Sequence, residues 1–154
     1  IMRELRKFYK NKTVLITGHT GFKGSWMAYA LDKFGAKVIG YSLPSQQINS
    51  NFNILKLNKK INNIYSDIRN KSALKNAIKK YRPDIIFHLA AQPLVRKSYE
   101  DPVNTIETNV NGTLNIINNS KDNKDLKSLV IITSDKCYKN KENIYGYDEN
   151  DELG

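Results

Sequence analysis

The feature that most constrains the fold is a glycine-rich loop placed between a strand signal and a helix signal. Residues 13–17 read TVLIT, a short apolar run typical of a strand buried on both faces. The loop GHTGFKGS follows at residues 18–25. Residues 21–34 then have helical spacing, and Gly35 is positioned to end the helix. One side of this predicted helix carries Phe22, Trp26, Ala30 and Phe34.

Strand and helix signals alternate along the rest of the chain. Further strands are predicted at residues 37–42, 63–68, 84–91 and 128–134, and helices at residues 51–60, 71–81 and 104–121. Strands separated by helices form a parallel sheet with right-handed crossovers. We therefore predict an α/β fold, a three-layer doubly wound parallel sheet (Rossmann-like) with strand order 3-2-1-4-5. The tail at residues 139–154 has no apolar periodicity and is predicted to be irregular.

The composition fits one domain without membrane or secretion signals. The chain has 154 residues, of which 40% are hydrophobic, enough for a packed core. No apolar stretch approaches the roughly 18 residues of a membrane span, and no apolar core follows the basic N-terminus as in a secretory peptide. Cys137 is the only cysteine, which agrees with a cytoplasmic location. With one Cys and two His, no metal site is expected.

The formal net charge of +10 raises the alternative of nucleic-acid binding. The excess is mostly lysine scattered through Asn- and Lys-rich segments, without an Arg-rich cluster or a basic stripe interleaved with aromatic residues. Lysines on solvated helix faces and loops explain this pattern. We therefore expect no nucleic-acid partner, while a basic surface favours an anionic nucleotide substrate.

The glycine loop allows three interpretations: a nucleoside-triphosphate site, a dinucleotide site, or no phosphate site. A Walker loop ends in Gly-Lys-Ser/Thr, and here the lysine precedes the glycine in Lys23-Gly24-Ser25. Gly18, Gly21 and Gly24 instead have the Gly-x-x-Gly-x-x-Gly spacing. Glycines also end strands for purely structural reasons, but the flanking strand and helix favour the dinucleotide site.

Each glycine has a physical task in a dinucleotide site. Gly18 permits the tight turn out of the strand, Gly21 lets the backbone approach the pyrophosphate, and Gly24 lets the helix pack closely. The pyrophosphate then lies on the N–H groups of the helix N-terminus. Lys23 either adds charge beside the phosphates or is a solvent-exposed lysine, and His19 is interpreted as a turn residue.

The end of the second strand does not decide between NAD and NADP. NAD sites of this kind place an acidic residue there to bind the ribose, and this chain has Tyr41-Ser42-Leu43. No arginine marks a 2′-phosphate either. Asp67 and Ile68, after the third strand, are placed to meet adenine, although Asp67 is equally suited to cap a helix.

Three further segments complete a resemblance. They are HLAAQPLVRKSYEDP at residues 88–102, TNVNGT at 108–113 and TSDKCY at 133–138. With the glycine loop, they make the chain resemble the extended short-chain dehydrogenase/reductase superfamily, and within it the CDP-glucose 4,6-dehydratases. The resemblance covers nearly the whole chain. It implies a tightly held NAD cofactor and the nucleotide sugar CDP-glucose as substrate, converted to CDP-4-keto-6-deoxyglucose.

The resemblance also implies which residues bind the cofactor. They lie on the glycine loop, after the second, third and fourth strands, and on the long helix. These residues are Gly18, Thr20, Gly21, Phe22, Lys23, Gly24, Ser42, Asp67, Ile68, Leu89, Ala90, Ala91 and Thr108, with Asn109 beside the last of them.

Catalysis is implied for the triplet Ser134-Asp135-Lys136 after the fifth strand. In dehydration, hydride leaves sugar C4, a base takes the C5 proton, an acid protonates the departing C6 hydroxyl, and hydride returns to C6. Asp135 is the candidate acid, Lys136 the candidate base, and Ser134 the hydrogen-bonding group for the C4 oxygen. Lysine titrates at about 10.4 in water. To act as a base it needs a lower pKa, which burial and the neighbouring nicotinamide cation would provide. Without the resemblance, a strand end with a surface charge pair is the favoured interpretation of the triplet; with it, catalysis is favoured.

The Tyr-x-x-x-Lys pair of the superfamily does not follow the fifth strand. Tyr29 and Lys33 have this spacing, but they lie on the first helix after the glycine loop and are interpreted as a coincidence. We therefore expect residues 1–154 to be an NAD-binding Rossmann domain, without the substrate-binding C-terminal part of its relatives and inactive alone. The alternatives are a non-catalytic dinucleotide-binding module and another nucleotide-sugar epimerase or dehydratase. Relatives often form dimers in which the long helix pairs with the helix that carries the Tyr-x-x-x-Lys pair, so the resemblance also leaves a homodimer open.

Overall fold

The computed structural model describes residues 1–134, 137–142 and 144–154. In these residues a parallel sheet has the strand order β3-β2-β1-β4-β5, which confirms the predicted topology. The strands are β1 (Thr13–Thr17), β2 (Lys37–Ser42), β3 (Asn62–Tyr65), β4 (Ile85–His88) and β5 (Ser128–Ile131). Strands β3, β4 and β5 each end three residues earlier than predicted. After β3 and β4, Ile68 and Leu89 pack against the two cores instead of pairing in the sheet.

The structure contains all the predicted helices and further helical segments that were not predicted. The described helical segments are α1 (Met2–Tyr9), α2 (Phe22–Lys33), α3 (Asn51–Ile54), η1 (Leu57–Lys59), α4 (Lys71–Tyr81), α5 (Val95–Glu100), α6 (Pro102–Ile106), η2 (Glu107–Asn111) and α7 (Gly112–Ser120). Neither α1 nor α5 was predicted from the sequence. The predicted helix at 51–60 is divided at Lys56, which has a left-handed φ of 53°.

The long predicted helix is present as α6, η2 and α7 in direct succession, and we call this segment the long helix. Its middle section, η2, is π-helical. Pro102 occupies its first turn, where a missing N–H costs nothing, and the Asp101 side chain accepts from the N–H of Asn104. A π turn inside a helix frequently marks a functional position.

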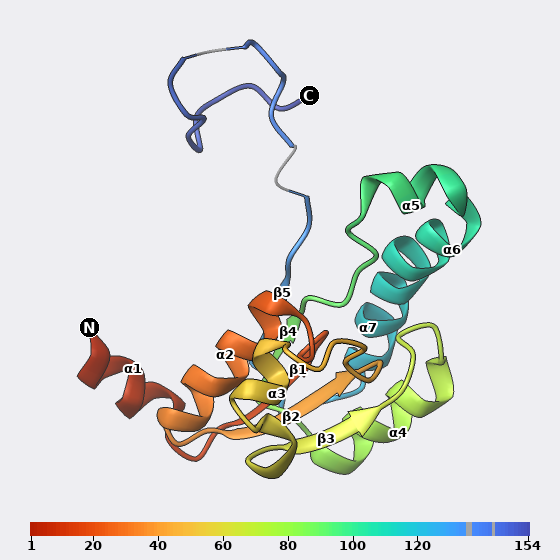
Figure 1. Cartoon of the computed structure of the whole chain (residues 1–154). Helices are drawn as coiled ribbons and strands as arrows, with labels where there is room; N and C mark the ends of the chain where they lie inside the picture. The colour runs from red at the N-terminus through yellow and green to blue at the C-terminus, as the bar shows by residue number, and fades with distance from the viewer. Residues whose placement is uncertain (135–136, 143) are drawn as a thin grey trace.

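Two hydrophobic cores lie on opposite faces of the sheet. Figure 1 shows α2 and α3 together on one side and α4 and α7 together on the other. Successive residues of β1 divide between the cores, with Val14 and Ile16 in one and Leu15 in the other. This division explains the continuous apolar run, because both faces of a doubly wound sheet are covered.

The buried side of α2 is formed by small residues. Gly24 and Ala28 are buried, together with Leu31. Phe22 and Trp26, on the side that the apolar spacing singled out, are 74% and 48% exposed. Small side chains let the helix axis approach the sheet, so the large aromatic residues point away from it.

His19 lies in the turn after β1, as interpreted, and its side chain is also buried. Its Nε2 lies 2.9 Å from Oδ1 of Asn63, and its ring meets the edge of Phe52 at a centroid distance of 5.3 Å. A Cβ at Gly40 would lie 2.3 Å from the ring of His19. The glycine in the middle of β2 therefore makes room for a side chain from the glycine loop.

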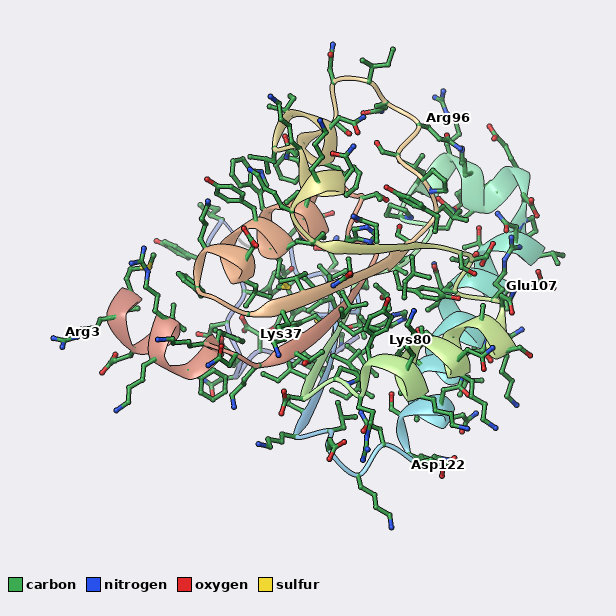
Figure 2. The ribbon with its side chains drawn as sticks, turned by 90° about the horizontal axis from the view of Figure 1, so that it is seen from below. Arg3, Lys37, Lys80, Arg96, Glu107 and Asp122 are labelled. Carbon is green, nitrogen blue, oxygen red and sulfur yellow. The ribbon has the colours of Figure 1, made fainter. Side chains whose placement is uncertain are left out.

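Charged side chains come from many elements. Figure 2 labels Arg3 on α1, Arg96 on α5 and Asp122 after α7, and these side chains lie at the rim of the molecule in this view. Across the described ranges, no helix combines the length and the apolar character needed to cross a bilayer.

Replacing Gly40 with alanine is expected to destabilise the fold. The added methyl group would overlap the buried His19 ring, and overpacking of this kind costs about 1–3 kcal/mol. Gly146→Ala is the matched control, because a Cβ there meets nothing within 4 Å. Urea denaturation measures both variants, and equal free energies of unfolding would contradict the close packing of Gly40 on His19.

Candidate functional site

A groove lies at the carboxyl edge of the sheet. It has a volume of about 530 Å³, and its lining includes Thr20, Gly21 and Phe22 of the glycine loop and Pro93 after β4. The rest of its lining comes from Pro44, Ser45, Gln46, Gln47, Asn49, Ser50 and Asn51, after β2. Figure 1 shows that the segments following β4 and β5 leave the sheet on the same side. Ligands of doubly wound sheets bind at this edge.

The glycine loop is folded so tightly that two of its glycines have no room for a side chain. Gly18 has a φ of +73°, and a Cβ there would lie 2.8 Å from the backbone nitrogen of Ala90. A Cβ at Gly24 would lie 2.2 Å from the carbonyl oxygen of Gly18. These contacts confirm the tight turn at Gly18. They show that Gly24 packs on the loop itself.

The N-terminus of α2 opens onto the groove. Gly21 is its N-cap in an extended conformation and supplies no side-chain cap. The N–H groups of a first helical turn have no partner inside the helix and carry the positive end of the helix dipole. Lys23 is exposed on the same turn. This end of α2 is suited to bind an anion such as a pyrophosphate.

Two hydroxyl groups connect the glycine loop to the end of β2. Oγ1 of Thr20 lies 2.9 Å from Oγ of Ser42 and 2.9 Å from the carbonyl oxygen of Leu43. Because the Leu43 carbonyl can only accept, Thr20 donates to it and Ser42 donates to Thr20. The predicted cofactor residues Thr20 and Ser42 are therefore brought together.

Asp67 does not cap α4. That helix is capped by Asn70, whose side chain accepts from the N–H of Ala73 at 3.0 Å. The carboxylate of Asp67 instead accepts from Arg69, and these hydrogen bonds lower the pKa of Asp67. The side chain of Ile68 is buried in the core below the long helix, where a Cβ at Gly112 would lie 2.7 Å from it.

A chain of hydrogen bonds joins β1 to the loop after β4. The hydroxyl oxygen of Thr17 accepts from the backbone N–H groups of Leu89 and Ala90, at 3.1 Å each. Nδ1 of His88 lies 2.7 Å from the same oxygen. A hydroxyl group has two acceptor lone pairs and one proton, so Thr17 donates its proton to His88.

The chain of hydrogen bonds continues through His88 to the long helix. Because Nδ1 accepts, the neutral ring carries its proton on Nε2 and donates it to Oγ1 of Thr113 at 3.0 Å. Thr113 donates to the carbonyl oxygen of Asn109 at 2.7 Å. Burial lowers the pKa of His88 to about 4, so the ring stays neutral at neutral pH. We call this arrangement of Thr17, His88 and Thr113 the hydroxyl–imidazole chain.

The long helix also holds the segment after β4 in place. Oδ1 of Asn109 accepts from the N–H of Gln92 at 2.7 Å, and its Nδ2 donates to the carbonyl oxygen of Gln92 at 3.1 Å. Thr108 is half-buried on the π-helical section beside it. Sequence reasoning missed the role of Thr17 and His88, although polar residues inside apolar strands were a visible signal.

The predicted catalytic residues follow β5. Ser134 is exposed three residues after the strand, while Asp135 and Lys136 lie outside the described residues. Tyr29 and Lys33 lie on α2, where Nζ of Lys33 is 5.5 Å from the centroid of the Tyr29 ring. Lys33 is at the end of α2 away from the glycine loop, which agrees with a coincidental spacing. In the described part of the chain, no group of three His, Cys, Asp or Glu side chains could hold a metal ion.

Most of the chain matches a known family. The sequence model for GDP-mannose 4,6 dehydratase covers residues 15–153. The chain belongs to this family. CDP-glucose 4,6-dehydratase from Salmonella typhimurium is 46% identical over 149 residues, which are 97% of this chain and 42% of that enzyme. The chain is thus a homologue of nucleotide-sugar 4,6-dehydratases, as the motifs predicted. It spans about two-fifths of the length of this relative.

Solved structures agree with the family assignment. Epimerase Mth375 from Methanothermobacter thermautotrophicus has a TM-score of 0.81 and 26% identity, over 97% of this chain and 43% of that one. UDP-glucose 4-epimerase from Thermus thermophilus, solved in complex with NAD, has a TM-score of 0.62 and 31% identity, over 70% of this chain and 33% of that one. Structural relatives of the family therefore bind NAD on this fold.

Acid is expected to destabilise the fold through two buried histidines. Burial lowers the pKa of both His19 and His88 from 6.5 to about 4. Between these values the unfolded chain binds protons that the folded chain excludes, so the free energy of unfolding falls as the pH falls. The loss amounts to about 3 kcal/mol for each histidine across the window and is absent above pH 6.5. Urea denaturation followed by circular dichroism at several pH values measures the slope.

The variant His88→Gln tests the contribution of one ring. It removes one of the two titrating groups, so the slope of unfolding free energy against pH should fall to about half. A slope unchanged from the wild type would show that His88 is not held neutral in the folded chain.

Proposed function

We propose that residues 1–154 form the NAD-binding domain of a CDP-glucose 4,6-dehydratase. One observation carries the proposal: the contact of Gly24 on the Gly18 carbonyl, which leaves the N-terminus of α2 open at the carboxyl edge of the sheet. The 46% identity to the Salmonella typhimurium enzyme supports this substrate over those of the epimerases. The neutral groove lining after β2 offers neither an acid nor an arginine to the ribose.

The residues present fit a dinucleotide. Added side chains at Gly18 or Gly24 would fill the turn that a pyrophosphate needs to approach, and the turn is kept clear. The loop with Thr20, Gly21, Phe22 and Lys23 would hold the pyrophosphate. Ser42, Asp67 and Ile68 would hold the adenosine half, and Leu89, Ala90, Ala91 and Thr108 the nicotinamide half. NAD, when bound, supplies the hydride acceptor and donor for dehydration.

We propose three roles in this reaction for the triplet after β5; the base for the C4 hydroxyl is the tyrosine of the superfamily's Tyr-x-x-x-Lys pair, which is not part of the triplet. We assign hydrogen bonding to the sugar C4 oxygen to Ser134, proton donation to the leaving C6 hydroxyl to Asp135, and proton removal from C5 to Lys136. The hydroxyl–imidazole chain fixes the backbone of Leu89 and Ala90, two of the residues proposed to hold the nicotinamide half. Its proposed contribution is to orient this segment.

The long helix is proposed as the surface of a homodimer. Four apolar residues on it, Val103, Ile106, Val110 and Leu114, are between 49% and 66% exposed. Their spacing of three and four residues places them on one side of a helix. Exposed apolar patches of this kind mark sites of association.

NAD binding by the 154-residue chain tests the cofactor assignment. Isothermal titration calorimetry is expected to detect NAD binding by the wild type. Gly24→Ala should lower the affinity at least about tenfold, because displacing the loop by a backbone overlap costs more than 1.4 kcal/mol. Gly146→Ala should bind like the wild type. A folded wild-type chain that binds no NAD would refute the proposal.

Turnover of CDP-glucose tests the domain assignment. The 154-residue chain is expected to bind NAD but not to dehydrate CDP-glucose, because its Tyr-x-x-x-Lys spacing occurs on α2, away from the groove. Absorbance of the 4-keto product in alkali measures the reaction. Multiple turnover by the purified chain would show that these residues contain the whole active site.

A further inference from the structure

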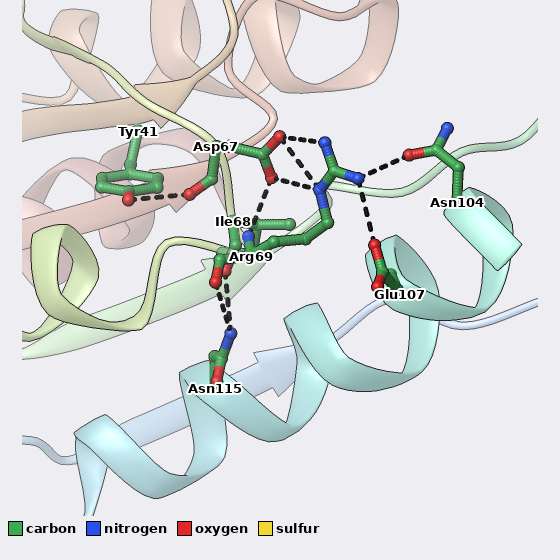
Figure 3. A network of polar contacts seen from close by, with 7 residues as sticks. All are labelled: Tyr41, Asp67, Ile68, Arg69, Asn104, Glu107 and Asn115. Carbon is green, nitrogen blue, oxygen red and sulfur yellow. Dashed lines mark hydrogen bonds and ion pairs between the residues drawn. The ribbon is translucent and has the colours of Figure 1, made fainter.

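Three N–H groups of Arg69 contact Asp67, the predicted adenine-binding residue. Its backbone N–H donates to Oδ1 of Asp67 at 2.8 Å. Its Nε lies 3.0 Å from Oδ1 and 3.1 Å from Oδ2, and its Nη2 donates to Oδ2 at 2.7 Å. Figure 3 shows the guanidinium group facing both carboxylate oxygens. This two-pronged contact fixes the plane of the carboxylate as a single-point contact could not.

The carboxylate keeps capacity for one more donor. A carboxylate has about four acceptor positions, and the three N–H groups of Arg69 occupy the positions that face it. The side chain of Asp67 is 28% exposed. The exocyclic amino group of adenine is a hydrogen-bond donor of the kind that a fixed, ionised carboxylate accepts.

The long helix holds Arg69 from the other side. Nη1 of Arg69 donates to Oδ1 of Asn104 at 2.7 Å and lies 3.4 Å from Oε2 of Glu107. Asn115 donates to the carbonyl oxygens of Ile68 and Arg69, at 3.2 and 3.3 Å. The backbone and the guanidinium group of Arg69 are therefore both attached to the helix (Figure 3).

The backbone of Asp67 is fixed independently by β2. The hydroxyl group of Tyr41 donates to the carbonyl oxygen of Asp67 at 3.0 Å. Burial raises the pKa of Tyr41, so the phenol keeps the proton that it donates. With its backbone held by Tyr41 and its carboxylate by Arg69, Asp67 presents one orientation to the carboxyl edge of the sheet.

We propose that Arg69 is a positioning residue that orients the Asp67 carboxylate toward the adenine amino group of the bound dinucleotide. The proposal rests on the proposed NAD-binding function. Partly exposed ion pairs contribute little to stability, so this network is explained better by orientation than by folding energy. The long helix, through Asn104 and Glu107, then sets the adenine subsite from the same segment that holds Gln92 after β4.

The experiment compares NAD with its inosine analogue, in which oxygen replaces the adenine amino group. Calorimetry on the 154-residue chain is expected to show a preference for NAD of about tenfold. Arg69→Gln should reduce the preference to about twofold, and Arg69→Lys, which keeps the charge but loses the fork, should give an intermediate value. In an Asp67→Ala background, Arg69→Gln should cause no further loss of preference, because Arg69 acts through that carboxylate.

The matched control is Arg82→Gln. Arg82 also pairs with an aspartate, through Nε and Oδ2 of Asp125 at 2.7 Å, but it lies beyond the end of α4, far from β3's carboxyl end. This variant should keep the wild-type preference, and circular dichroism verifies that each variant is folded.

The outcomes separate this proposal from the proposed function. A wild type that binds no NAD overturns both. A wild type that binds NAD, with an Arg69→Gln variant that keeps the full preference, overturns only the role of Arg69. An equal loss of affinity for both dinucleotides would also overturn it, because Arg69 would then support the fold without orienting Asp67.

Discussion

The hydroxyl group of Thr17 is the contact on which the carboxyl edge of the sheet depends. It satisfies two backbone N–H groups where the chain leaves β4, and it fixes the tautomer of His88 by donating to Nδ1. The ring can then reach Thr113 on the long helix. Every member of this buried chain is satisfied only if the others keep their places, since buried polar groups without partners are costly.

The long helix also positions the two loops that follow β3 and β4. Asn109 holds Gln92 after β4, while Asn115 and Asn119 bind the backbone between Ile68 and Lys71 after β3. The loops that are proposed to receive the two halves of the dinucleotide are therefore positioned by one rigid element. The π-helical section Glu107–Asn111 contains Asn109, whose side chain donates to the carbonyl oxygen of Gln92.

Sequence patterns predicted the parts of this site that depend on local backbone geometry. Glycines have no side chain, and the sequence shows directly where they stand. The turn at Gly18 and the close packing of Gly24 both follow from this. Contacts between distant side chains were less visible. His19 lies in a turn as interpreted, but the burial of its ring was not predicted, because nothing in the sequence shows that Gly40, on the next strand, leaves space for it.

The sequence by itself determined the strand order and the place of the glycine loop. Apolar strands separated by helices permit few topologies. The spacing Gly-x-x-Gly-x-x-Gly between a strand and a helix specifies a tight turn at that place. Only the tertiary structure decided that Asp67 pairs with Arg69 and that Thr17, His88 and Thr113 form one chain of hydrogen bonds. Thr17 bonds groups that are 71 to 73 residues away in the sequence, and these donors and acceptors are matched only when the sheet brings them together. Arg69 is only two residues from Asp67, but its other partners, Asn104 and Glu107, are 35 and 38 residues away on the long helix.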